Sequence, residues 1–140
     1  MVILDTNHIS ILERRGADAY PLMARLAAIP ASDVCVTVIS YEEQVRGWMA
    51  AIAATKSSSA QVLHYSRLMT QLENYCNLSV LPYTADAATQ FETLRKQHRR
   101  LGSPDLKIAA IALVNDATLL TQNTRDFRDI TNLKIEDWTR

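Results

Sequence analysis

Met1-Val2-Ile3-Leu4-Asp5-Thr6-Asn7 opens the chain with an apolar run that changes abruptly to three polar residues. The apolar residues 2–4 are typical of a short strand that is buried on both faces of a parallel sheet. The polar residues 5–7 prefer turns and helix starts. If the strand is parallel and central, Asp5 lies at its carboxyl end, which is where open α/β sheets bind their ligands.

Four further apolar segments alternate with helical segments along the chain. They are Val34–Val38, Leu78–Leu81, Thr118–Thr121 and Leu133–Glu136. This alternation predicts an α/β fold with a mostly parallel central sheet of about five short strands. Right-handed crossovers would place helices on both faces of the sheet. We expect residues 1–140 to form a single domain, because this length suits one hydrophobic core and is too short for two.

Helices are predicted between these strands. They are Ile9–Arg15, Pro21–Ile29, Ser40–Thr55, Ala60–Tyr75, Ala85–Leu101 and Leu106–Val114. Ser40 and Glu43 have the spacing of a capping box, and Ser103 followed by Pro104 is a strong helix start. The third and fourth helices are expected to pair as an antiparallel hairpin. The last helix is apolar nearly all round and should therefore be buried.

Composition indicates a soluble globular protein. Lys and Arg together number 15, as do Asp and Glu, so net charge gives no sign of a polyanionic partner. No apolar run approaches the length of a membrane span, and the N-terminus has no signal-peptide pattern. Cys35 and Cys76 lie far apart in apolar surroundings without a CxxC pattern. We therefore expect reduced, buried thiols in a cytoplasmic protein.

Asp5, Glu43, Asp105 and Asp126 each follow a strand closely or open a helix. In a parallel sheet such positions share one edge, so the four acids can converge there. Clustered carboxylates repel one another, and a hard divalent cation such as Mg²⁺ or Mn²⁺ relieves that repulsion. Such a cation acidifies a bound water and stabilises charge on a phosphoryl group. The predicted chemistry is metal-dependent phosphodiester hydrolysis.

Each of these acids also has a purely structural explanation. Asp5 can cap a helix, and Glu43 can serve the capping box that Ser40 begins. Asp105 in a first helical turn gains about 0.3–1 kcal/mol from the helix dipole. Asp126 can form a turn or cap the short segment at Phe127. The shared type of position favours the functional interpretation, and these alternatives stay open.

Four short motifs carry a resemblance to a known family. They are Ile3-Leu4-Asp5-Thr6-Asn7, Ile39-Ser40-Tyr41-Glu42-Glu43 with Gly47 four residues on, Asp105-Leu106-Lys107-Ile108-Ala109-Ala110, and Thr121-Gln122-Asn123-Thr124-Arg125-Asp126-Phe127. Their order and spacing resemble the four motifs of PIN-domain nucleases over essentially the whole chain. The compact single-domain form is similar to the VapC-type toxins of bacterial toxin–antitoxin pairs.

This resemblance implies an RNA endonuclease that uses Mg²⁺ or Mn²⁺, is inhibited by a small antitoxin and is usually a homodimer. Gly47, four residues after Glu43, favours Glu43 over Glu42 as the second acid. Carried onto this sequence, the catalytic and metal-site residues would be Asp5, Glu43, Asp105 and Asp126. The polar residues that orient carboxylates or waters would be Thr6, Asn7, Thr121 and Asn123.

Basic residues gather in the second half of the chain, and a solvated helix face is the simplest explanation for them. Four of them are candidates to contact RNA phosphates: Arg99, Arg100, Lys107 and Arg125. Lys107 lies on an otherwise apolar helix, where it would either reach a phosphate or pair with an acid. The three histidines, His8, His64 and His98, lack metal-ligand spacing and are expected to be structural.

Trp48 lies on the predicted helix hairpin, which would serve dimerisation, antitoxin binding or both. We hypothesise that the antitoxin lays an apolar helix along this hairpin.

Three other functions compete with the toxin. A haloacid-type phosphatase also starts with a strand and an aspartate, but it needs a second aspartate where Asn7 stands. A catalytically idle PIN-like module that binds RNA or a partner would retain the fold without cleavage. A housekeeping RNA-processing nuclease would cleave RNA without an antitoxin, and a short reading frame directly upstream of the gene would favour the toxin instead.

Overall fold

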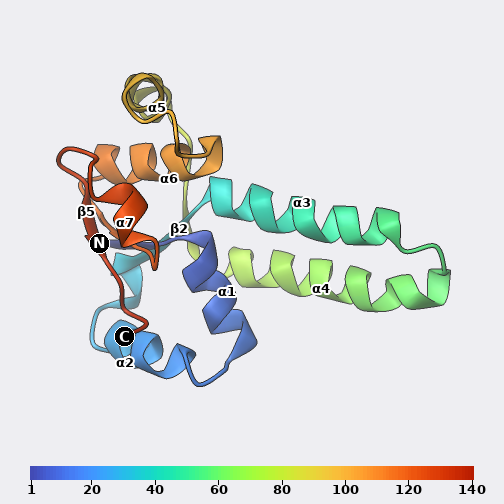
Figure 1. The fold of residues 1–140 in the computed structure, drawn as a ribbon. Helices are drawn as coiled ribbons and strands as arrows, with labels where there is room; N and C mark the ends of the chain where they lie inside the picture. Colours follow the sequence, from blue (N-terminus) through green and yellow to red (C-terminus); the bar gives the residue numbers. More distant parts are fainter.

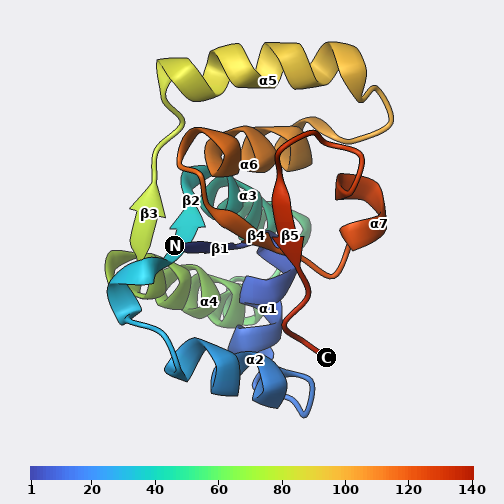
Figure 2. The same cartoon turned by 90° about the vertical axis from the view of Figure 1, so that its left-hand side faces the viewer.

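A sheet of five parallel strands organises the chain, and the computed structural model describes residues 1–140. The strand order is β3-β2-β1-β4-β5, so β1 lies in the centre (Figure 2). The strands are β1 (Val2–Leu4), β2 (Val34–Thr37), β3 (Ser79–Leu81), β4 (Thr118–Leu120) and β5 (Lys134–Glu136). All four strand pairs are parallel, which confirms the predicted α/β fold with five short strands.

Seven α-helices connect and cover the strands. They are α1 (Thr6–Arg14), α2 (Ala19–Ala27), α3 (Val38–Ala54), α4 (Ser58–Cys76), α5 (Ala85–Gln97), α6 (Ser103–Val114) and α7 (Thr124–Phe127), with a 3₁₀ turn at Ala31–Asp33. Figure 1 shows α5 and α6 on one side of the sheet and α1 and α2 on the other. The helices α3 and α4 pair as the predicted antiparallel hairpin, which projects from the body of the domain (Figure 1). No helix is both long and apolar enough to cross a membrane.

Alternating strand residues build a separate core on each face of the sheet. Ile3 and Leu119 point into a core that also includes most of α6. Leu4 and Leu120, one residue further along the same strands, belong to the core formed with α1 and α2. The helix α6 is buried along most of its length, as its apolar sequence predicts. Apolar cores therefore cover both faces of the central strands β1, β2 and β4.

The start of α3 differs from the sequence-based expectation. The N-cap is Thr37, the last residue of β2, whose hydroxyl accepts a 3.2 Å hydrogen bond from the Ser40 amide. Ser40 is itself buried in the first turn, so the predicted capping box of Ser40 and Glu43 is wrong. Likewise Ser103 does not cap α6. Gly102 occupies that position, and the Ser103 hydroxyl accepts a hydrogen bond from Arg95.

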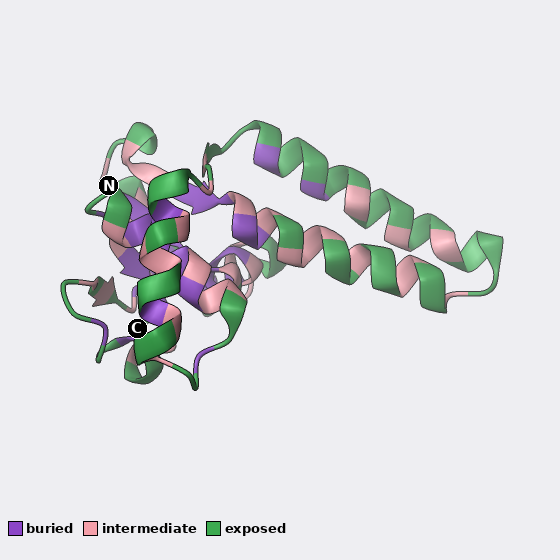
Figure 3. Cartoon of the chain, turned by 90° about the horizontal axis from the view of Figure 1, so that it is seen from above, coloured by how far each residue is buried: buried purple, intermediate pink, exposed green.

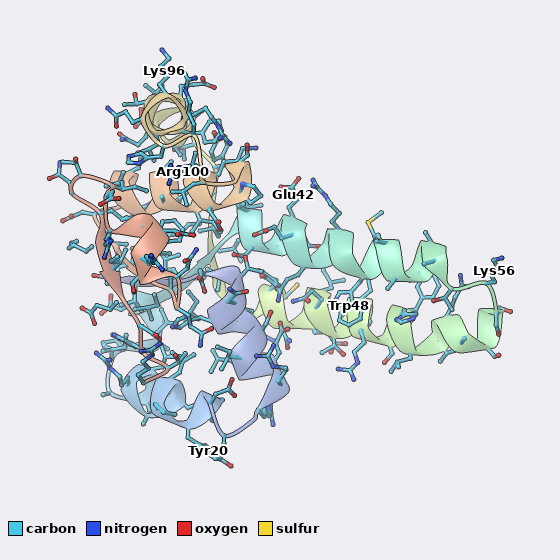
Figure 4. All side chains as sticks on the ribbon, viewed as in Figure 1. Tyr20, Glu42, Trp48, Lys56, Lys96 and Arg100 are labelled. Carbon is cyan, nitrogen blue, oxygen red and sulfur yellow. The ribbon has the colours of Figure 1, made fainter.

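The base of the hairpin is fastened by polar side chains. The Trp48 indole N–H donates a 3.2 Å hydrogen bond to Gln71, and Figure 4 shows Trp48 between the two helices. Gln71 donates in turn to Gln44 and to Glu13 on α1. Beyond this base the hairpin is exposed or half-buried (Figure 3). Both cysteines are free thiols, but only Cys35 is buried, and the expected burial of Cys76 is wrong because α4 presents it to solvent.

Candidate active site

Asp5 lies between β1 and α1 at the carboxyl edge of the sheet. Its backbone amide donates a 3.0 Å hydrogen bond to the carbonyl of Leu120, which continues the pairing of β1 with β4. Its carboxylate caps α1, because Oδ1 accepts a 2.8 Å hydrogen bond from the His8 amide. Asp5 is only 8% exposed. The helix-cap explanation is thus correct, and it leaves Oδ2 of the same carboxylate without a hydrogen bond to the protein.

Glu43 reaches the same edge from the second turn of α3. Its Oε1 accepts a 2.7 Å hydrogen bond from the Thr6 hydroxyl, which also lies 2.9 Å from the Ser40 hydroxyl. The Glu43 carboxylate therefore bonds to a side chain of α1 instead of capping its own helix. Thr6 belongs to the first motif and Glu43 to the second, so this bond joins two segments that are distant in sequence.

Asp105 lies in the first turn of α6 and is half-buried. Burial raises the pKa of its carboxyl group above the ordinary value, and the charges of Glu43, Asp5 and Asp126 raise it further. Asp5, Glu43 and Asp126 lie in the segments that follow β1, β2 and β4, and these strands are neighbours in the parallel sheet. The structure thus brings the four predicted acids to one edge of the sheet.

Asp126 lies in the short helix α7 and is exposed. Its Oδ2 accepts a 2.8 Å hydrogen bond from the side-chain amide of Asn123. The backbone amide of Asn123 donates to the hydroxyl of the buried Thr121 at 2.9 Å. Thr121 and Asn123 therefore hold the fourth acid in place. Asn7, by contrast, is exposed and makes no side-chain hydrogen bond.

The charges of this site are not balanced by protein cations. Glu43, Asp105 and Asp126 make no ion pair with any Lys, Arg or His side chain. The ammonium of Lys107 lies 5.7 Å from the ring centre of Tyr83 and 5.6 Å from that of Phe91, directed toward α5. Lys107 thus pairs with no acid, contrary to one of its two predicted roles.

The donor set of the site consists of carboxylate oxygens, which suit a hard divalent cation. No group of three or more His, Cys, Asp or Glu side chains is arranged to hold a metal ion by itself. Mg²⁺ is usually held by one or two carboxylates and keeps waters or substrate phosphates as its other ligands. The four acids fit a cation bound in that way.

His8 is a residue whose part in the site the sequence analysis missed. It is fully buried, and its Nδ1 lies 3.2 Å from Oδ1 of Asp5. Its Nε2 lies 3.8 Å from the carboxylate of Asp137, which follows β5. The helical spacing of Asp5 and His8 signals the first contact, because residues three apart lie on one helix face. The contact with Asp137 has no such signal.

A basic hollow of about 700 Å³ adjoins the acidic site. It is lined by Lys96, Gln97, His98, Arg99, Arg100, Leu101, Arg125, Asp126, Arg128 and Asp129. None of its Lys or Arg side chains makes an ion pair. Asp126 belongs both to this hollow and to the acidic site. The structure thus gathers Arg99, Arg100 and Arg125 around a hollow that Asp126 also lines, and Lys107 is not part of its lining.

The fold and the site together define an α/β domain with a carboxylate cluster at the carboxyl edge of a parallel sheet. The PIN domain family model matches residues 2–133, and the chain belongs to this family. It is 30% identical to "Ribonuclease VapC1" of Haemophilus influenzae, with 99% of this chain and 98% of that protein covered. This finding confirms the family resemblance of the four motifs.

Two further similarities agree with this assignment. The "tRNA(fMet)-specific endonuclease VapC" of Shigella flexneri is 29% identical over 111 residues, which is 76% of each chain. The crystal structure of DNA-bound VapBC from Salmonella typhimurium contains a chain with a TM-score of 0.75 and 26% identity. That match covers 98% of this chain and 97% of the Salmonella chain.

Proposed function

We propose that this protein is a VapC-type endoribonuclease that hydrolyses phosphodiester bonds in RNA. The observation that carries this proposal is the convergence of Asp5, Glu43, Asp105 and Asp126, none of which pairs with a Lys or Arg side chain. Membership of the PIN domain family and the relatives named as VapC ribonucleases support it.

Asp5, Glu43, Asp105 and Asp126 would hold Mg²⁺ or Mn²⁺ at the carboxyl edge of the sheet. When bound, the cation supplies an acidified water and neutralises negative charge on the phosphoryl group. The Thr6 hydroxyl orients Glu43, and the Asn123 amide orients Asp126. The Thr121 hydroxyl in turn accepts a hydrogen bond from the backbone amide of Asn123 and so holds Asn123 in place. The exposed Asn7 stays a candidate for contact with water or substrate.

The basic hollow provides the place for the RNA backbone. Arg99, Arg100 and Arg125 have no carboxylate partners, so their guanidinium groups are free to meet phosphates. Phosphate contacts of this kind supply most of the affinity for nucleic acid that does not depend on sequence. Because Asp126 lines the hollow, a strand bound there would continue into the acidic site. Lys107, which packs on aromatic rings, contributes to RNA binding only after a change of rotamer.

The hairpin of α3 and α4 provides a surface for a cognate antitoxin. Its exposed apolar side chains include Met49, Val62, Leu63, Tyr65 and Met69. An apolar helix laid on such a surface would bury them, as amphipathic partner helices do in hydrophobic grooves. The Salmonella relative was crystallised as VapBC, which supports a partner protein for this chain. A homodimer would place a second copy on part of the same surface.

The test is cleavage of a pool of small RNAs by the purified protein with Mg²⁺ or Mn²⁺, with EDTA, and with an Asp5→Asn variant. Asparagine keeps the size of the side chain and an oxygen that can cap α1, but it removes the charge. We expect discrete fragments that require both the metal and Asp5. Asp116→Asn, an exposed acid that pairs with Lys134, is the matched control and should cleave normally.

Two results would contradict the proposal. Equal cleavage by the wild type and Asp5→Asn would identify a contaminating nuclease. RNA binding without metal-dependent cleavage would favour the catalytically idle PIN-like module.

A further inference from the structure

Ser40 belongs to the second motif, and the proposed function assigns it no part. It is 0% exposed, and Thr37 rather than Ser40 caps α3. The Ser40 hydroxyl lies 2.9 Å from the hydroxyl of Thr6 and makes no other hydrogen bond. A buried hydroxyl with a single partner, placed next to one of the four acids in the helix, calls for an explanation.

Neighbouring strands deliver Thr6 and Ser40 to the same edge of the sheet. β1 and β2 are paired in parallel, so both end at the carboxyl edge. One residue separates β1 from α1, which begins at Thr6, and β2 passes directly into α3. The Ser40 amide donates a 3.2 Å hydrogen bond to the hydroxyl of Thr37, the last residue of β2. The sheet therefore sets the backbone positions from which the Thr6 and Ser40 hydroxyls meet.

The direction of the hydrogen bond between these two hydroxyls follows from the contact of Thr6 with Glu43. A threonine hydroxyl has one proton, and an ionised carboxylate only accepts. The proton of Thr6 therefore goes to Oε1 of Glu43, at 2.7 Å. In the 2.9 Å contact the Thr6 oxygen must then be the acceptor, so Ser40 is the donor. The result is a directed chain of hydrogen bonds from Ser40 through Thr6 to Glu43.

Helix geometry explains why one hydroxyl of α1 meets two residues of α3. Ser40 and Glu43 are three positions apart and so lie on one face of α3. The Ser40 donor gives the Thr6 hydroxyl a second contact and so restricts rotation of the Thr6 side chain. Hydrogen bonds in a chain also polarise one another, which strengthens the bond to Glu43. Without the Ser40 hydroxyl, Thr6 would be held by the carboxylate that it has to orient.

We propose that Ser40 is a positioning residue, whose hydroxyl holds the Thr6 hydroxyl and through it the Glu43 carboxylate. Because Ser40 is fully buried, it acts through Thr6 and does not touch the substrate. The value of a fixed Glu43 rests on the proposed nuclease function, whereas the contacts among the three residues do not.

The first test is a double-mutant cycle of thermal unfolding, with no metal or RNA present. Ser40→Ala in the wild type removes a hydrogen-bonded hydroxyl and should lower the melting temperature. Thr6→Val keeps the shape of the side chain but leaves the Ser40 hydroxyl buried without a partner, which is costly. In that background Ser40→Ala removes the unpaired hydroxyl, so its cost should shrink strongly or change sign. An equal cost of Ser40→Ala in both backgrounds would overturn the proposal.

The second test measures Mn²⁺ binding by calorimetry without RNA, together with cleavage kinetics. Residues that orient metal ligands typically change affinity or activity by about 10–100-fold, so we expect roughly tenfold weaker Mn²⁺ binding in Ser40→Ala. We also expect kcat to fall while KM stays the same, because Ser40 is buried away from the substrate. Ser10→Ala is the matched control, since the Ser10 hydroxyl donates a 3.0 Å hydrogen bond to the backbone carbonyl of Thr6 and not to its side chain. It should keep both Mn²⁺ affinity and kcat.

Two further variants separate the hydroxyl from the space that it fills. Ser40→Cys nearly keeps the size of the side chain but has only a weak donor, whereas Ser40→Thr keeps the hydroxyl and adds a methyl group. The proposal predicts that Ser40→Thr retains Mn²⁺ affinity better than Ser40→Cys. The reverse order would assign Ser40 to packing and overturn the proposal.

Failure of the proposal and failure of the nuclease function give different results. A wild type that bound no Mn²⁺ and cleaved no RNA would refute the proposed function alone, because the unfolding cycle would still decide whether Ser40 holds Thr6. If Ser40→Ala lost only melting temperature, with Mn²⁺ affinity and kcat intact, Ser40 would be merely structural, and the nuclease function would stand.

Discussion

Thr6 and Glu43 are joined by a 2.7 Å hydrogen bond from the Thr6 hydroxyl to Oε1 of the carboxylate. The two residues are 37 positions apart and belong to α1 and α3. The bond holds Oε1 of Glu43. Because the carboxylate is rigid, it also restricts the position of the other oxygen, Oε2. The Thr6 hydroxyl therefore orients the Glu43 carboxylate relative to the first motif.

Replacement of Thr6 tests this dependence. We expect Thr6→Val, which keeps the shape but removes the hydroxyl, to lower kcat/KM for RNA cleavage by about tenfold. Thr6→Ser keeps the donor and should retain most of the activity. Initial rates with a single RNA substrate would measure both variants. Equal rates for Val and Ser at this position would show that Glu43 needs no orientation by Thr6.

Asp105→Asn should abolish cleavage and yet raise the stability of the metal-free protein at neutral pH. The pKa of Asp105 is raised in the folded state, first by burial and then by the neighbouring acids. The folded protein therefore binds this proton more tightly than the unfolded chain, so ionisation of Asp105 destabilises the fold as pH rises through the raised pKa.

Thermal unfolding of Asp105→Asn and wild type between pH 3 and 8 would measure this effect. The difference in melting temperature should be largest at pH values above the raised pKa and vanish below the unfolded-state value of about 3.9. Mg²⁺ should stabilise the wild type more than the variant, because only the wild type has the complete set of acids. If Asp105→Asn were less stable than the wild type at pH 7 without metal, ionised Asp105 would not destabilise the fold, and the prediction would be wrong.

Arg99→Gln combined with Arg100→Gln should weaken RNA binding without changing the chemistry. Both residues line the basic hollow and neither touches the four acids, so we expect KM to rise while kcat stays the same. The dependence of log affinity on log salt should become shallower by about 0.7 for each phosphate of a single strand that an arginine no longer neutralises. Lys56→Gln, at the far tip of the hairpin, removes one positive charge away from the hollow and is the control for each single arginine variant (Figure 4). An unchanged salt dependence would remove these arginines from the RNA surface.

Met49→Lys tests the outer face of the hairpin. Met49 is 58% exposed and lines an apolar groove on α3 with Tyr41 and Val45. A lysine there would have to be desolvated beneath a partner helix, so we expect the affinity for the antitoxin to fall more than about tenfold, or 1.4 kcal/mol. If a short reading frame adjoins the gene, its co-expressed product is the binding partner to assay by calorimetry.

Thr89→Lys, on the exposed face of α5, is the control for this substitution. Cleavage by Met49→Lys without the antitoxin should equal that of the wild type. Intact antitoxin binding with loss of a dimer on size-exclusion chromatography would instead assign the groove to the homodimer.

Local pattern was sufficient to predict the five strands, the helix hairpin and the buried helix α6. Each of these depends on the distribution of apolar side chains within one segment. The start of α3 was not predicted correctly, because β2 passes into the helix without a polar break. The capping hydroxyl is that of Thr37, inside a run that is typical of a strand.

The acidic site was predictable to a similar degree. The positions of the four acids follow from strand ends, and the edge that they share follows from a parallel sheet. The contact of His8 with Asp137 does not follow from any pattern, because it joins the first helix to the segment after the last strand. The direction of the Lys107 side chain could not be predicted either. Its ammonium lies near the rings of Tyr83 and Phe91, which belong to α5 and the segment just before it.

The central place of β1 has a consequence for synthesis of the protein. The first strand to leave the ribosome must wait for β4, its neighbour in the sheet, which begins only at Thr118. Asp5 is therefore made first but meets Asp126 only after nearly the whole chain has emerged. Translation that stops before α7 yields a chain without the fourth acid, Asp126. The four acids can thus meet only in chains that extend past Asp126.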